Sequence, residues 1–142
     1  MKAYSILALT VVGVYSLVSS HAKGYEKTME VTAYCTCRAC CGPSARGITA
    51  SGDRAVGKLI AAPKKYPFGT IMTIPGYGRA VVKDRGGAIQ EAGKTLSRGM
   101  HVGKDPVPVR KLKYDRLDVL MPTHREAKRW GCKIVTVKIE NP

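Results

Sequence analysis

The sequence predicts a small, mainly β domain with one short helix. Short apolar stretches alternate with Pro and Gly turns along most of the chain, and this spacing is typical of a small barrel or sandwich. In the last stretch Val135, Val137 and Ile139 alternate with Lys or polar residues, which indicates a half-buried closing strand over 133–139. The other expected strands cover residues 30–34, 59–62, 71–74, 79–83 and 117–121.

The helix is expected directly before the closing strand. Thr123 is followed three residues later by Glu126, which is the pattern of a capping box. Trp130 precedes Gly131, a residue that commonly ends a helix. The sequence therefore predicts a helix over residues 123–130.

Residues 1–22 have the pattern of an export signal. Lys2 precedes an apolar stretch over 6–18, and Ser20 and Ala22 are small residues at the usual cleavage positions. The stretch is shorter than the ~20 residues of a membrane span, although an uncleaved anchor is an alternative. Cleavage leaves residues 23–142 as one secreted or periplasmic domain, long enough to be a monomer with its own core.

The chain is strongly basic. It has 24 Lys and Arg against 10 Asp and Glu, and the formal net charge of +14 attracts polyanions. One Trp and one Phe are too few aromatic residues for a protein that stacks nucleic-acid bases. Because an exported chain meets the cell wall first, we expect anionic cell-wall polymers as partners and no nucleic acid.

Two aspartates stand in unusual surroundings. Asp84 ends an apolar alternation and is followed by Gly86 and Gly87, which allow the backbone to approach a ligand closely. Asp118 lies inside an apolar, strand-like stretch, where burying an acid costs free energy unless its charge is used. Turn or capping aspartates are the alternative, but these surroundings favour a functional site.

The order of several short motifs is informative as a set. The motifs are Val31-Thr32-Ala33-Tyr34, Thr49-Ala50-Ser51-Gly52, Ile60-Ala61-Ala62-Pro63, Asp84-Arg85-Gly86-Gly87-Ala88-Ile89, Arg116-Leu117-Asp118 and Trp130-Gly131. Together they resemble the three-aspartate (3D) domain, which is related to the catalytic part of the membrane-bound lytic transglycosylase A family. The resemblance covers about residues 31–139 and implies a six-stranded double-psi β-barrel with the short helix before its last strand.

The sequence departs from the family pattern at three places. The family has an acid before the proline, whereas this chain has Ala62 before Pro63. Gln90 stands where a Lys is common. The stretch between Gln90 and Asp115 is also much longer than in the family. Because long structureless loops are uncommon, we expect an ordered insertion at about 91–115.

The resemblance implies an exported peptidoglycan lytic transglycosylase, used in cell-wall remodelling or phage lysis. Such enzymes cleave the β-1,4 bond between N-acetylmuramic acid and N-acetylglucosamine and leave 1,6-anhydro ends. Asp118 takes the acid/base position and Asp84 is the second catalytic residue. Burial or the like charge of Asp84 should raise the pKa of Asp118. The reaction needs no cofactor and no metal.

Further residues are candidates for binding the glycan. The hydroxyls of Tyr34, Thr49 and Ser51 are expected to line a groove, and hydrogen bonds within a strand or turn are the alternative for each. Arg116 and the main-chain amides of Gly86 and Gly87 complete the expected site. The side chains of Arg116, Lys83 and Arg85 are expected to point to solvent or to substrate, and His124 is expected at the surface.

The cysteines admit two interpretations. Disulfide bonding is favoured in an exported chain, although an odd number leaves at least one thiol unpaired. The alternative is zinc, because Cys37 and Cys40 have the spacing of a zinc knuckle and Cys35 or Cys41 could be a third ligand. The five residues are Cys35, Cys37, Cys40, Cys41 and Cys132.

Two other functions compete with the enzyme. A non-catalytic, expansin-like barrel that binds cell-wall polysaccharide fits the acid missing before Pro63, because a fold does not fix a function. A small cationic disulfide protein that acts on anionic membranes fits the charge, and it would lose activity at high salt.

Overall fold

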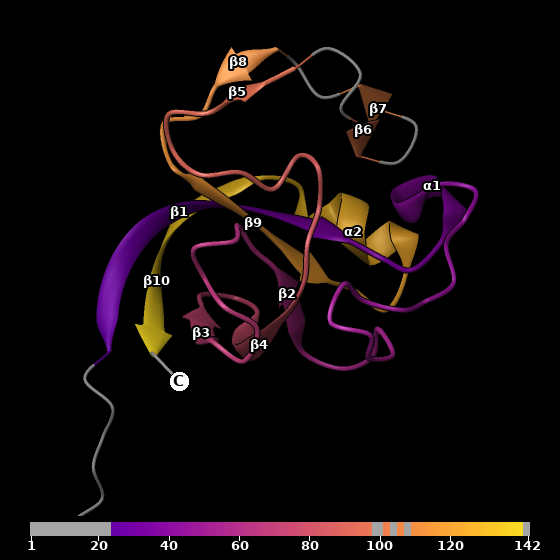
Figure 1. The fold of residues 1–142 in the computed structure, drawn as a ribbon, viewed down its shortest axis with the longest axis horizontal. Coiled ribbons are helices and arrows are strands. Elements are labelled where there is room, and N and C mark those ends of the chain that lie inside the picture. The colour runs from indigo at the N-terminus through magenta and orange to yellow at the C-terminus, as the bar shows by residue number, and fades with distance from the viewer. Residues whose placement is uncertain (1–23, 98–100, 103–104, 107–108, 141–142) are drawn as a thin grey trace, which may run out of the picture.

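The computed structural model describes residues 24–97, 101–102, 105–106 and 109–140. The predicted export signal, 1–22, lies outside the described residues. Six strands close a barrel (Figure 1). In their order around the barrel they are β1 (Tyr25–Tyr34), β10 (Lys133–Glu140), β3 (Ile71–Ile74), β4 (Gly78–Asp84), β2 (Leu59–Ala61) and β9 (Asp115–Leu120).

The barrel is mixed. β1 runs parallel to β9 and β2 runs parallel to β4, whereas the other neighbouring pairs are antiparallel. The predicted fold class is confirmed: a mainly β chain forms a closed six-stranded barrel with a short helix before its last strand. β1 begins earlier than predicted, because its first half pairs with β10 from Tyr25 onward.

Apolar and polar residues alternate along the barrel strands, so the inner face of the barrel wall is apolar and the outer face carries polar side chains. Val31, Leu117 and Val119 are fully buried in the core, where each large apolar side chain contributes roughly 1.5–3 kcal/mol. Successive side chains of a strand point to opposite faces, so Thr32 and Asp118 lie on the outer face of β1 and β9. The outer face therefore carries the polar groups that the core excludes.

The helix α2 (His124–Trp130) confirms the predicted N-cap at Thr123. The Thr123 hydroxyl oxygen accepts a hydrogen bond from the Glu126 amide at 3.2 Å and lies 2.7 Å from the Glu126 carboxylate. Trp130 donates to the Val31 carbonyl at 3.1 Å and packs edge-on against Tyr77, which fixes the helix on the barrel. Among the described residues, no helix combines the length and hydropathy needed to cross a membrane.

The expected insertion contains short ladders in its described part. β5 (Thr95–Leu96) pairs with β8 (Arg110–Lys111), and β6 (His101–Val102) pairs with β7 (Asp105–Pro106), all on one side of the barrel (Figure 1). Leu96 and Leu112 are buried together with Ala88. Arg110 binds both carboxylate oxygens of Glu30, at 2.5 and 2.6 Å, and so ties the insertion to β1.

Asp115, at the start of β9, is the least solvent-exposed acid of the described residues. Its side chain has no exposure and binds Lys27 and Lys65 at 2.8 and 2.7 Å, the Tyr66 hydroxyl, and the Ala92 amide at 2.8 Å. Burial acts to raise the pKa of Asp115, but these donors outweigh it and hold the pKa below its ordinary value. This carboxylate joins β1, β9, the 62–70 loop and the start of the insertion.

Asp115→Asn is expected to lower the free energy of unfolding by about 3 kcal/mol, because it removes the charge that two lysines share. Urea denaturation at pH 7 measures the loss. The matched control is Asp53→Asn, which breaks an exposed pair with Lys83 and should leave the transition almost unchanged.

The same variant tests how the contribution of Asp115 to the free energy of unfolding depends on pH. Since the folded pKa of Asp115 is depressed, its contribution is complete above the unfolded pKa of about 4 and is lost as the pH falls below it. The difference between wild type and Asp115→Asn should therefore shrink between about pH 4 and pH 2. A difference that is constant with pH contradicts this role.

Candidate functional site

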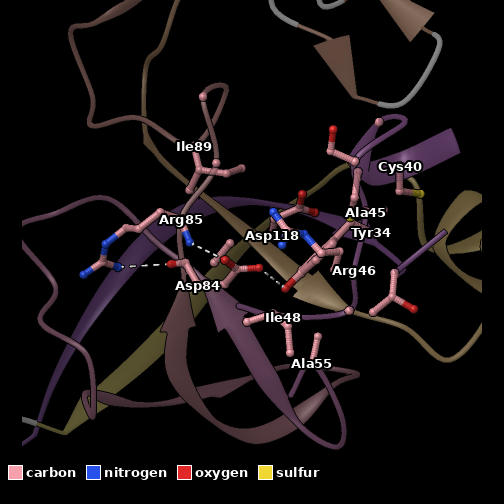
Figure 2. A pocket seen from close by; sticks show the side chains of 18 of the residues that line it. Tyr34, Cys40, Ala45, Arg46, Ile48, Ala55, Asp84, Arg85, Ile89 and Asp118 are labelled. Carbon is pink, nitrogen blue, oxygen red and sulfur yellow. Dashed lines mark hydrogen bonds between the residues drawn. The ribbon is translucent and has the colours of Figure 1, made fainter. Parts of the chain in front are cut away.

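One pocket of about 820 Å³ opens on the outer face of the barrel. Arg85 and Ile89 lie on one side of it and Cys40, Ala45 and Arg46 on the other (Figure 2). Its lining residues are Tyr34, Thr36, Cys40, Cys41, Gly42, Ser44, Ala45, Arg46, Gly47, Ile48, Ala55, Ala61, Asp84, Arg85, Gly86, Gly87, Ala88, Ile89 and Asp118.

The strand register brings the two predicted catalytic acids together. Ala61 of β2 pairs with Asp84 of β4 on one side and with Asp118 of β9 on the other. Directly paired residues share a face of a sheet, and neighbouring strands lie about 4.8 Å apart, so the two aspartate Cα atoms are about 10 Å apart. The small Ala61 side chain leaves the space between the two acids open to the pocket.

Asp84 is held by three hydrogen bonds. The Tyr34 hydroxyl donates to one carboxylate oxygen at 2.6 Å and the Arg85 amide to the other at 2.8 Å (Figure 2). The Ala50 amide also donates to that second oxygen, at 2.9 Å. Burial, and after it Asp84, raises the pKa of Tyr34 above its ordinary value. The phenol therefore stays protonated and serves as a donor to Asp84.

Asp118 has a different environment. It is 8% exposed, and one oxygen lies 3.1 Å from the Thr32 hydroxyl, which is also 3.1 Å from the Leu117 carbonyl. Burial, with a smaller contribution from Asp84, raises the pKa of Asp118 to about 7, against the opposing effects of Thr32 and Arg116. Near neutral pH this carboxyl group can therefore hold a proton or release one.

The expectation for the basic side chains was wrong at two of three positions. The Arg116 side chain is 8% exposed, with Nε 3.4 Å from a carboxylate oxygen of Glu30, and it does not line the pocket. A buried glutamate needs a cation, and Arg116 supplies one. Arg85 lines the pocket, but its guanidinium donates to the Ala62 and Tyr66 carbonyls at 2.9 and 2.8 Å.

Only one of the three predicted hydroxyl ligands lies in the pocket lining. Tyr34 lines the pocket, whereas Thr49 and Ser51 lie outside its lining. The Thr49 hydroxyl is 3.0 Å from that of Ser51 and 3.1 Å from the Asp53 carbonyl, so the turn itself uses both groups. Lys83, the third basic residue, pairs with Asp53 at 2.9 Å.

Gly86 and Gly87 lie in the pocket lining. A Cβ atom on Gly86 would be 2.9 Å from the Ile89 side chain, so only glycine allows this close approach. Ala62, where the family pattern has an acid, is fully buried in the barrel core.

Three residues near the acids were not predicted as site residues from the sequence. Arg46 and Ile48 lie in the 43–53 loop, where no pattern indicates which side chains reach the pocket. Thr32 contacts Asp118, and strand alternation could have identified it, because it stands two residues before Tyr34 on the same face. His124, expected at the surface, is half-buried against the cysteine turn.

No family model matches this chain. Over 124 residues it is 28% identical to YabE of Bacillus subtilis (strain 168), a protein named for cell wall shaping. Over 129 residues it is 29% identical to YocH of the same organism, named as a cell wall-binding protein. Each match covers 87% of this chain but only 25% of YabE and 37% of YocH.

The Asp118 carboxyl is expected to titrate near pH 7 in a carbon-13 NMR experiment, well above an ordinary aspartate, because of its burial. Thr32→Val should move the midpoint higher still, since the Thr32 hydroxyl favours the ionised form. A midpoint near pH 4 in the folded wild type would contradict the described environment of Asp118.

Proposed function

We propose that this chain is an exported cell-wall protein that binds peptidoglycan glycan strands in the pocket and cleaves them as a lytic transglycosylase. The observation that carries the proposal is a nearly buried aspartate, Asp118, at the floor of an open pocket and one residue across from Asp84. Asp118 is the general acid and base of the reaction.

The chemistry asks one carboxyl group to act twice. Protonated Asp118 gives its proton to the glycosidic oxygen as the bond from that oxygen to C1 of N-acetylmuramic acid breaks, and the bonding electrons leave with the oxygen. The resulting carboxylate then takes the proton of the C6 hydroxyl while O6 forms the new bond to C1. Asp118 is protonated again at the end, and the product is a 1,6-anhydro sugar.

The surroundings of Asp118 support this double role. A pKa of about 7 lets the group lose and regain a proton at neutral pH. Asp84, fixed by Tyr34 and two amides, supplies a charge or a hydrogen-bond acceptor next to the oxocarbenium-like transition state. Arg46 is an exposed cation in the pocket lining, where an anionic lactyl or peptide carboxylate of the wall polymer can bind.

The wider molecule also fits a cell-wall location. The relatives are named for cell wall shaping and cell wall binding, and the pattern of residues 1–22 supports export. The formal net charge of +14 favours binding to the anionic polymers of a cell wall. The single 23–142 domain, with its insertion at about 91–115, is the unit that we propose acts as a monomer.

Asp118→Asn is expected to reduce the release of anhydromuropeptides from purified peptidoglycan at least about 100-fold, because the amide cannot donate or accept the proton. Mass spectrometry of the soluble products measures the loss. Glu140→Gln, which alters an exposed pair with Arg79 at the far end of β10, should keep wild-type activity. Equal product from wild type and Asp118→Asn would refute the assignment of Asp118.

A second candidate function is binding without cleavage. Ala62 stands buried where the family pattern has an acid, and the name of YocH describes binding alone. If this function is the correct one, insoluble peptidoglycan retains wild type and Asp118→Asn equally and neither releases sugar. Co-sedimentation, with the same supernatants analysed for anhydro ends, separates the two functions in one experiment.

A further inference from the structure

We propose that the chain binds one zinc ion in a closed structural site beside the pocket. The site consists of three thiolates and one imidazole, those of Cys35, Cys37, Cys40 and His124. It is independent of the proposed activity, because the reaction needs no metal and these four ligands do not include either acid.

The four ligand atoms lie close to the spacing of a tetrahedral metal site. All lie within 4.8 Å of one another. Cys35 Sγ is 3.1 Å from Cys37 Sγ and 3.5 Å from Cys40 Sγ, and His124 Nδ1 is 3.6 Å from Cys37 Sγ and 3.3 Å from Cys40 Sγ. Around zinc, bonds of about 2.3 Å to sulfur and 2.0–2.1 Å to nitrogen place neighbouring ligand atoms about 3.5–3.8 Å apart.

The ligand set selects the metal and its role. Three thiolates and an imidazole suit zinc, whereas Ca²⁺ and Mg²⁺ prefer oxygen ligands. The protein fills all four positions of a tetrahedron, which leaves no position for a reactive water. Such a site stabilises structure and does not activate substrate.

A disulfide explains the arrangement less well. Cys35 and Cys37 are separated by one residue, which makes a relaxed disulfide between them difficult. A bond from either to Cys40 would leave one thiol and the His124 imidazole in the same cluster without a function. All five cysteines of the chain are free thiols in the structure, so the disulfides favoured by the sequence are not observed.

The position of the site explains what zinc would hold together. Cys35 directly follows β1, Cys37 and Cys40 belong to the turn around the short helix α1 (Arg38–Cys41), and His124 is the first residue of α2. Cys40 also lines the pocket. One ion would therefore fasten the turn around α1, which forms part of the pocket wall, to α2, a helix more than eighty residues away in the sequence. The short helix α1 has no buried apolar residue that could hold it in place.

Metal analysis of the chain, purified with a reducing agent and without added metal, tests the site. We expect about one zinc ion per chain after exhaustive dialysis. His124→Ala should lose the zinc, and His124→Cys should keep it, since a fourth thiolate completes the tetrahedron. The matched controls are Cys41→Ser and Cys132→Ser, exposed thiols outside the cluster, which should retain it.

Thiol counting gives the second readout. With zinc bound, a thiol reagent should modify two thiols per chain, those of Cys41 and Cys132, and a chelator should expose three further thiols. Less than about half an ion per wild-type chain, zinc retained by His124→Ala, or cysteines found as disulfides each overturn the proposal. Because no readout involves peptidoglycan, the result does not depend on the proposed enzymatic activity.

Discussion

The space between Asp84 and Asp118 is the constraint on which the site depends. Both acids flank Ala61 on the outer face of the barrel, and the parallel pairing of β2 with β4 and the antiparallel pairing of β2 with β9 set their positions. A larger side chain at position 61 would fill the floor of the pocket between them. The chemistry proposed for the site therefore follows from strand register and from one small residue.

Two aspartates of β9, three residues apart, show how the environment assigns different tasks to the same side chain. Asp115 has two lysines, a tyrosine and an amide around it, which favour its charge, and it fastens four segments of the chain. Asp118 is also buried, but Thr32 and Arg116 compensate its burial only in part. One carboxyl group is therefore structural, and the other is suited to proton transfer.

The barrel was largely predictable, because alternation, turn residues and the Thr123 capping box are local signals that tertiary packing reinforces. The motifs around Asp84 and Asp118 also located the acids and the glycines beside them. The role of Arg116 was not predictable, since Glu30, the group that uses its side chain, is found only by folding. For Thr49 the structure shows the alternative left open by the sequence, a hydrogen bond within the turn. The contact of His124 with the cysteine turn was missed for the same reason.

A crystal structure of the Asp118→Asn chain with a bound peptidoglycan fragment would show whether the glycan binds between Asp84 and position 118. We expect a glycan strand lying across Ala61, with a glycosidic oxygen about 3 Å from the side chain at position 118 and the C6 hydroxyl of the adjoining N-acetylmuramic acid within reach of it. A strand bound elsewhere on the barrel, with this pocket open to solvent, would contradict it.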